Sequence, residues 1–187
     1  MNRLLGTAKG EFFFKMTDAR MGEVLAEWHR PQIITRDAGL VAAAHFKGEM
    51  TGGLKMLAIG TGATGNLLSP DAPQDTQRKL NNEIARKAFS STTYRTAEGV
   101  AVSYRTNIVD FTTTFGESEA VGALNEMGLL VPYSTNPATR NPINNGPTNY
   151  DPSLDTQGLD LLVNYLCFAC IAKPATAVLA ITWRLSF

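Results

Sequence analysis

The chain has 187 residues, and its 17 Lys and Arg balance 17 Asp and Glu, so its formal net charge is zero. A neutral chain has no overall field to attract nucleic acid or an anionic membrane, and no apolar run approaches the roughly 18 residues of a bilayer-spanning helix. Charged residues are only 18% of the sequence, below the roughly 25% of an ordinary soluble domain. Surfaces with little charge are often covered by neighbouring subunits, which gives a first indication of an assembly component. The start of the chain resembles no export signal, so we expect a soluble, non-exported protein.

The first 50 residues are predicted to form an N-terminal arm with short helices. The aromatic run Phe12 to Phe14 indicates a buried strand or an arm that docks on a neighbour. Apolar residues then recur at helical spacing from Asp18 to His29, which predicts an amphipathic helix that ends before Pro31. A second helix is predicted from Asp37 to Phe46, because this stretch is rich in alanine and Gly48 is placed to end it.

The segment from Leu54 to Ile59 is predicted as a buried strand that runs into Gly60 to Gly65. These glycines satisfy the G-x-G-x-x-G pattern of dinucleotide sites. That site needs a helix to begin at the third glycine, and Pro70 and Pro73 interrupt the stretch where the helix would run. We therefore interpret the glycines as the exit of a strand and expect no bound nucleotide.

A further helix is predicted after the proline-rich stretch. Asp75 or Thr76 can cap it, and Leu80, Ile84 and Lys87 follow at steps of four and three residues. Basic residues surround this helix, but neighbouring acids offset them and aromatic residues for base stacking are lacking, so no nucleic-acid binding is expected. The basic residues are Arg78, Lys79, Arg86 and Lys87.

The rest of the chain is predicted to be β. Two strands, 89–96 and 100–108, flank a short connection in which Gly99 can take a positive φ, as is typical of a hairpin. Further strands are predicted at Phe111 to Phe115 and at Gly122 to Val131.

A polar stretch and two strands complete the chain. Residues 133–157 are rich in Asn, Pro, Thr and Gly, which predicts one long exposed loop that is available to grip a neighbour. Strands follow at Tyr165 to Ala172 and Ala177 to Phe187, and strict alternation in the second gives it one buried face. The two are expected to pair. The predicted fold is mainly β, an antiparallel β-sandwich over residues 51–187, with a few short helices in the N-terminal half.

The cysteines and histidines suggest no metal site or cofactor. Cys167 and Cys170 form a C-x-x-C, but no second cysteine pair accompanies them, and His29 and His45 lie far away without ligand spacing. Within a strand, positions three apart point to opposite faces, so this pair cannot chelate a metal. We interpret the cysteines as small buried apolar side chains and expect the fold to be held by packing.

The carboxylates offer no clear catalytic arrangement. Glu117, Glu119 and Glu126 are close in sequence, and a pair for acid–base work is conceivable. Neither histidine lies beside a serine or cysteine in a recognisable nucleophile motif. Solvated loop charge is therefore our interpretation of these glutamates, and we do not expect an enzyme.

Several short segments, taken in order, resemble a family of small virion structural proteins from tailed bacteriophages. The segments are Pro31 to Leu40, Leu57 to Gly62, Asp75-Thr76 with Glu83 to Lys87, Asn125 to Leu129, and Leu179 to Phe187. The resemblance covers residues 31–187 with gaps. It implies a β-sandwich building block without catalysis, located in a virion that is assembled in the cytoplasm of the bacterial host.

The resemblance and the composition together predict a tail, neck or fibre component. Its partners would be copies of itself, in a ring or a trimer, and other virion proteins, with no nucleic acid and no membrane. A capsid decoration protein is the alternative within the same class. A carbohydrate- or receptor-binding β-sandwich is the alternative from another class, because aromatic and amide side chains of the long loop suit sugars. The interface candidates are Phe12, Phe13, Phe14, Tyr133, Asn136, Asn141, Asn144, Asn145 and Tyr150.

Overall fold

The computed structural model describes residues 9–49, 53–131 and 160–187. This part of the chain is mainly β with one helix, α1, at Arg36–Lys47. The strands in chain order are β1 Lys9–Asp18, β2 Val24–Ile34, β3 Met56–Gly60, β4 Gly65–Asn66, β5 Ser69–Pro70, β6 Glu83–Ala88, β7 Ser91–Arg95, β8 Ala101–Val102, β9 Ile108–Phe115, β10 Gly122–Val131, β11 Leu161–Lys173 and β12 Ala177–Ser186.

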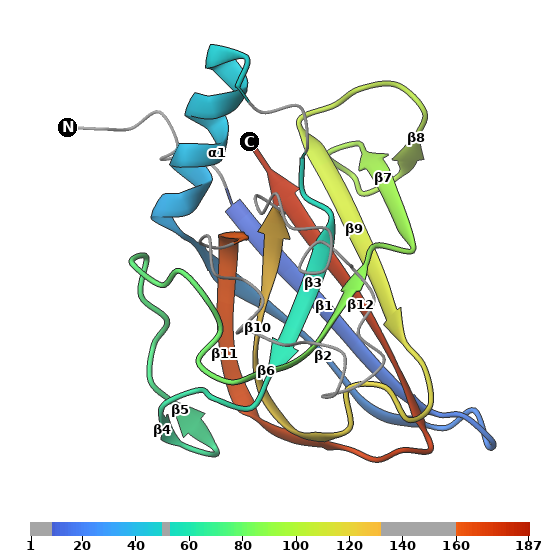
Figure 1. The fold of residues 1–187 in the computed structure, drawn as a ribbon. Helices are drawn as coiled ribbons and strands as arrows, with labels where there is room; N and C mark the ends of the chain where they lie inside the picture. Colours follow the sequence, from blue (N-terminus) through green and yellow to red (C-terminus); the bar gives the residue numbers. More distant parts are fainter. Residues whose placement is uncertain (1–8, 50–52, 132–159) are drawn as a thin grey trace.

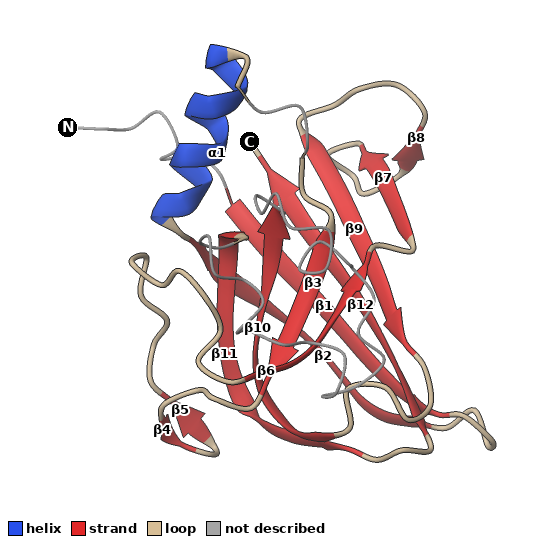
Figure 2. Cartoon of the chain, in the orientation of Figure 1, coloured by secondary structure: helices blue, strands red, loops and turns tan. Residues whose placement is uncertain are grey.

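Ten of these strands form one continuous antiparallel sheet in the order β6-β3-β10-β11-β2-β1-β12-β9-β7-β8. The sheet folds over at β2, which pairs with β1 along most of its length but with β11 only at Ile33 and Ile34. At the opposite side, the Phe89 N–H donates to Lys55 O on one layer and the Ser90 N–H to Thr112 O on the other. The two layers of strands are visible in Figure 2. The prediction of a mainly β, antiparallel, sandwich-like fold is confirmed.

The core lies between the two layers and is rich in aromatic rings. Phe12 packs edge-on against Trp183, with ring centroids 5.3 Å apart, and Phe14 stacks on Trp28 at 4.8 Å. Trp28 in turn contacts Phe168 of β11, with centroids 5.2 Å apart, so β2 carries the contact from one layer to the other. The alternation predicted for the last strand is confirmed over Ala177–Ser186, because its inward residues, among them Trp183, are buried.

The helix α1 confirms the prediction for Asp37 to Phe46 within one residue at each end. Gly48 ends it in the left-handed region, with φ at 77°, and its N–H donates to the helix carbonyl of His45. Ala38 and Val41 pack against the ends of β10 and β11. The helix therefore closes part of one end of the sandwich (Figure 1).

The predicted helix from Asp18 to His29 is wrong, because this segment forms the turn between β1 and β2 and the first half of β2. Asp18 accepts the N–H groups of Arg20 and Met21, and Gly22 has a φ of 69°. Cross-strand pairing with the phenylalanine run overrides the helical spacing. Strands β1 and β2 consequently lie in the middle of the sheet, so residues 9–34 do not belong to a separate N-terminal arm.

The predicted helix that begins at Asp75 or Thr76 is also wrong. Residues 75–82 are irregular, and Glu83–Ala88 is the strand β6, which pairs with β3. The hairpin around Gly99 is present, with a φ of 85° at the glycine, but its second strand, β8, has only two residues.

The expected pairing of the last two strands is wrong as well. β12 lies between β1 and β9, and β11 pairs with β10 and β2. Phe187, predicted on the buried face of the last strand, is 56% exposed. The alternation identified the second of these strands, because it depends on burial alone, but it carries no information on which strands become neighbours.

Candidate functional site

The prediction that Glu126 is a solvated loop charge is wrong, since this β10 residue is fully buried. Its Oε1 accepts the N–H groups of Gly62 at 2.9 Å and Asn82 at 2.7 Å. Its Oε2 accepts the N–H of Asn81 at 2.9 Å and the hydroxyl of Tyr165 at 2.7 Å. We call Glu126 with these four donors the carboxylate latch. It ties two connections of the chain to the sheet, and both of its oxygens are occupied as acceptors.

Burial and the latch together affect the ionisation of Tyr165. Desolvation raises the pKa of its phenol, and hydrogen bonds with Cys167 and Glu126 raise it further. Burial also raises the pKa of the Cys167 thiol. Neither group is therefore prepared as a nucleophile or a base near neutral pH. The latch is built to hold the chain in place, and its geometry leaves no oxygen for a substrate.

The other glutamates differ from one another. Glu117 is exposed, as predicted. Glu119 pairs with Lys87 at 2.5 Å and accepts the Gly116 N–H. Burial works against ionisation of Glu119, but Lys87 and this N–H outweigh it and hold its pKa below the usual range. Glu119 and Glu126 have separate partners and Glu117 lies in water, so these carboxylates are not arranged as an acid–base pair.

The four basic residues that were expected around one helix lie partly in β6 and partly in the irregular stretch before it. Arg86 is buried in β6, where it pairs with Glu83 and with Asp160 at the start of β11. Burial raises the pKa of Glu83, and the Arg86 guanidinium partly offsets this. Arg78 instead pairs with Asp37 of α1 at 3.4 Å. A continuous basic surface is thus not formed by these side chains.

The histidines and cysteines are not brought together either. His29 lies on β2 and His45 is exposed on α1, while Cys167 and Cys170 are both free and partly buried on β11. In the ranges that the structure describes, no group of three or more His, Cys, Asp or Glu side chains is arranged to hold a metal ion. No helix in those ranges is both long and apolar enough to cross a bilayer.

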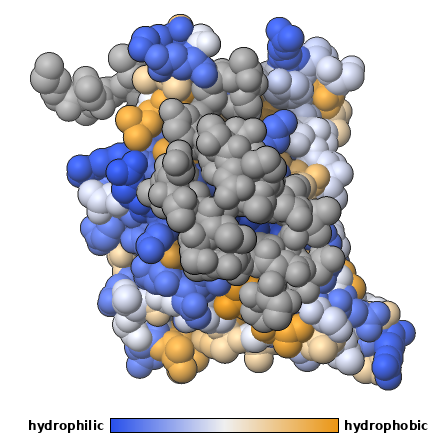
Figure 3. Space-filling model, viewed as in Figure 1, coloured by the Kyte–Doolittle hydropathy of each residue, from blue (hydrophilic) through white to orange (hydrophobic). Residues whose placement is uncertain are grey.

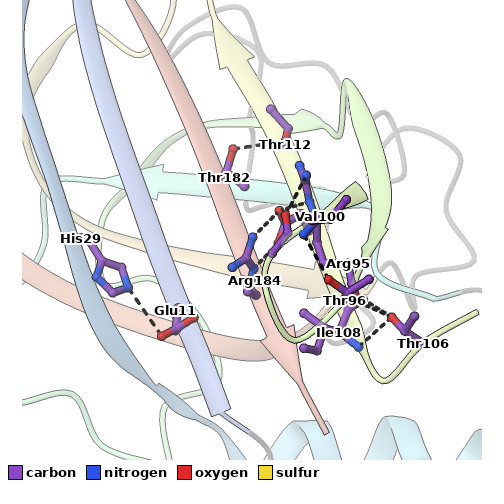
Figure 4. A network of polar contacts seen from close by, with 12 residues as sticks. Glu11, His29, Arg95, Thr96, Val100, Thr106, Ile108, Thr112, Thr182 and Arg184 are labelled. Carbon is purple, nitrogen blue, oxygen red and sulfur yellow. Dashed lines mark hydrogen bonds and ion pairs between the residues drawn. The ribbon is translucent and has the colours of Figure 1, made fainter. Parts of the chain in front are cut away.

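The outer face of the layer that contains β1, β12 and β9 is a polar wall with paired side chains (Figure 4). Asp110 accepts two hydrogen bonds from Arg184, at 2.7 and 3.0 Å, and one from Arg95 at 2.8 Å. The Phe13 ring lies between the Arg184 guanidinium, 5.2 Å away, and the His29 ring, stacked at 4.5 Å. The charges and the aromatic ring of this wall are thus already matched within the chain.

The predicted interface candidates are placed differently from one another. Phe12 and Phe14 are buried in the core, so their assignment to an interface is wrong. Phe13 points to the polar wall, because side chains alternate along a strand. The remaining six candidates lie outside the described residues, and so does the loop predicted at 133–157. They are Tyr133, Asn136, Asn141, Asn144, Asn145 and Tyr150.

Exposed large apolar side chains occur instead at the two ends of the sandwich. One end, the hairpin end, carries the β1–β2, β4–β5, β9–β10 and β11–β12 connections (Figure 1). The β11–β12 connection accepts backbone hydrogen bonds from the other two long hairpins, from Ala19 to Thr176 and from Ser118 to Ala175. The other, the helix end, carries α1, the β7–β8 hairpin and Phe187 (Figure 1). The exposed side chains of the hairpin end are Met21, Val24, Leu25, Leu67, Leu68 and Val121, and those of the helix end are Leu40, Phe46, Tyr94, Val100, Tyr104 and Phe187.

The most exposed of these side chains lie at tips. Phe46 on α1 is 92% exposed, and Leu67 and Leu68 at the tip of the β4–β5 hairpin are 63% and 80% exposed. Figure 3 shows apolar residues along the lower edge of the molecule, where this hairpin lies. The sequence analysis missed the Leu67-Leu68 pair. Its signal was two leucines between Gly65-Asn66 and Ser69-Pro70, which are turn-forming residues.

The chain matches no protein-family model and no curated protein sequence. Glu119, Glu126, Arg86 and Asp110 are engaged with partners in the chain, whereas the apolar side chains at the two ends are left in water. This arrangement is suited to binding other proteins.

Proposed function

We propose that the chain is a structural component of a tailed phage virion, which assembles as a homo-oligomer and docks on tail, neck or fibre proteins. The observation that carries the proposal is the gathering of exposed apolar side chains at the two ends of the sandwich, with a polar, internally paired wall between them. The resemblance of the short sequence segments to virion structural proteins supports the location.

Physical chemistry favours contacts at these ends. Burying one exposed leucine, valine, methionine or phenylalanine side chain contributes roughly 1.5–3 kcal/mol. The hairpin end has six such residues, and the helix end has four together with Tyr94 and Tyr104. Exposed apolar side chains that gather on a surface generally mark interaction sites. The zero net charge means that copies do not repel one another when they are packed closely.

The polar wall supports the same proposal, because its side chains already have partners within the chain. Its arginines are held on Asp110, and its Thr112 and Thr182 hydroxyls lie 3.2 Å apart (Figure 4). Groups that already satisfy one another gain little from a new partner. We therefore assign assembly to the ends and assign the wall to the outside of the assembly.

Mass spectrometry of purified particles tests the virion location. Particles of the phage that encodes this chain would be banded on a density gradient and compared with the unassembled fraction of the same lysate. We expect the chain in the banded particles at a fixed ratio to the tail proteins. Its confinement to the unassembled fraction would contradict the proposal.

A further inference from the structure

The β4–β5 hairpin is a rigid projection at the hairpin end. Its strands pair at Gly65 with Pro70 and at Asn66 with Ser69. The Asn66 side chain accepts the Leu68 N–H at 2.8 Å, and the Leu67 carbonyl accepts the Cys170 N–H of β11 at 2.7 Å. The backbone that carries the two exposed leucines is therefore held in place before any partner arrives, which lowers the entropic cost of binding.

The turn itself does not explain two leucines at this tip. Two-residue hairpin turns ordinarily use Gly, Asn or Asp. Among the described residues other than glycine, positive φ values occur at Ser118 and Ala120, so Leu67 and Leu68 have negative φ values that many polar residues adopt as readily. The leucine side chains thus gain nothing from the local backbone, and they are left without burial within the described chain.

The helix end carries a recess of matching chemistry. A cleft of about 150 Å³ lies between α1 and the sheet, and the described side chains that line it are all apolar, among them Ala38, Val41, Leu54, Val163, Leu185 and Phe187. Apolar cavities of roughly this volume accept a benzene-sized group, which is larger than the side chain of leucine. The cleft can therefore receive one leucine of the hairpin tip.

The tip and the cleft of one molecule cannot meet. Val163 lines the cleft, and Cys170 anchors the hairpin seven residues further along the same strand, a separation of roughly 23 Å in an extended chain. Figure 1 shows the hairpin and α1 at opposite ends of the sandwich. A tip that projects from one end and a cleft at the other are arranged for contact between different copies.

We propose that the Leu67-Leu68 tip of one copy inserts into the cleft beside α1 of a second copy, so that the chain assembles head to tail. This inference rests on the proposed function and specifies its interface. Such a contact joins two different surfaces, so each bound copy still offers a free tip and a free cleft. The assembly then closes into a ring if the rotation between copies permits, and otherwise extends.

The proposal is tested by mixing two one-sided variants, in each of which only one of the two contact surfaces, the tip or the cleft, is changed. The tip variant carries Leu67→Ser and Leu68→Ser. The cleft variant carries Ala42→Glu, which adds a charge to the cleft lining. Glutamate is a good helix former, so this change within α1 should leave the helix intact. The matched control is Leu25→Ser, which changes a half-exposed leucine of β2 at the same end of the sandwich. Sedimentation velocity gives the mass of each species, and circular dichroism checks that each variant keeps the β fold.

We expect each one-sided variant to weaken self-association at least about tenfold, while Leu25→Ser changes it less. The equimolar mixture should form a species of twice the 20.2 kDa chain mass and nothing larger, because one intact tip meets one intact cleft. If the wild-type protein self-associates but the mixture remains monomeric, or if the tip variant associates like the wild type, the head-to-tail contact is refuted and the proposed function stands. A wild-type protein that is monomeric at every concentration refutes both.

Discussion

Two neighbouring stretches of one connection, residues 60–63 and 65–70, have opposite relations to the rest of the molecule. The first lies against the carboxylate latch, where Gly62 donates its N–H to Glu126 and Ala63 donates to Asn125. The second leaves the surface as the β4–β5 hairpin and holds Leu67 and Leu68 in water. The polar groups of the first stretch are hydrogen-bonded inside the chain, whereas the apolar side chains of the second stretch remain exposed to water.

In the described residues, this contrast separates groups that stabilise the fold from groups that are available to a partner. A buried carboxylate attracts attention as a candidate catalyst, yet Glu126 already accepts four hydrogen bonds at both oxygens. An exposed leucine pair looks unremarkable in sequence, yet it has no purpose within the described fold. Groups left without partners indicate where another molecule binds.

Glu126→Gln should produce the largest loss of stability. The amide replaces one acceptor oxygen by an NH₂ group that faces N–H donors, so we expect the free energy of unfolding to fall by about 3 kcal/mol. Urea unfolding measures this loss. The control is Glu23→Gln, whose side chain is exposed and whose effect should stay within about 0.5 kcal/mol. Equal stability of the two variants would contradict the latch.

Gly62→Ala should be the next most harmful change. A Cβ at this position would overlap the backbone nitrogen of Asn82 and lie 2.6 Å from Glu126 Oε1, so we expect a loss of about 1–3 kcal/mol. Gly53→Ala is the matched control, because nothing lies within 4 Å of its added Cβ. Thermal unfolding would compare them. A Gly62→Ala protein as stable as Gly53→Ala would show that the first stretch is not held tightly.

Tyr165→Phe removes one of the four latch donors and should cost about 1–2 kcal/mol at neutral pH. Because burial raises the phenol pKa above its ordinary value of 10.0, the folded protein keeps this proton while the unfolded chain releases it. Tyr165 therefore contributes stability below about pH 10 and loses that contribution as the pH rises further. The stability difference between wild type and Tyr165→Phe should shrink above pH 10 in urea titrations. A constant difference would contradict this account.

Asp110→Asn tests the wall and should have the smallest effect. It weakens the hydrogen bonds from Arg184 and Arg95, and we expect a loss of about 1 kcal/mol. Self-association should not change, because the wall is assigned to the outside of the assembly. Light scattering over a concentration series provides the comparison. A large drop in association would move the interface from the ends to the wall.

Much of the fold follows from alternation and helix-ending signals in the sequence. β12 and β10 match their predicted ranges closely, because alternating or continuous apolar residues indicate strands irrespective of their neighbours. The failures came from long-range pairing. The apolar residues of Asp18 to His29 suit a helix, and only their registration against the phenylalanine run of β1 makes this segment a hairpin.

The candidate site was less accessible to sequence reasoning. The latch joins Glu126 to donors 44, 45 and 64 residues away, and no local pattern reports such a convergence. The predicted Phe12 and Phe14 interface failed because an aromatic run signals burial without saying whether the partner is the same chain. The Leu67-Leu68 tip was detectable in principle as an apolar pair between turn formers.

Sedimentation velocity of the wild-type protein over a wide concentration range tests the central claim most directly. Assembly through the two apolar ends predicts species heavier than the 20.2 kDa chain, with a population that grows with concentration and falls when Leu67 and Leu68 are replaced by serine. A single 20.2 kDa species at every concentration would contradict it.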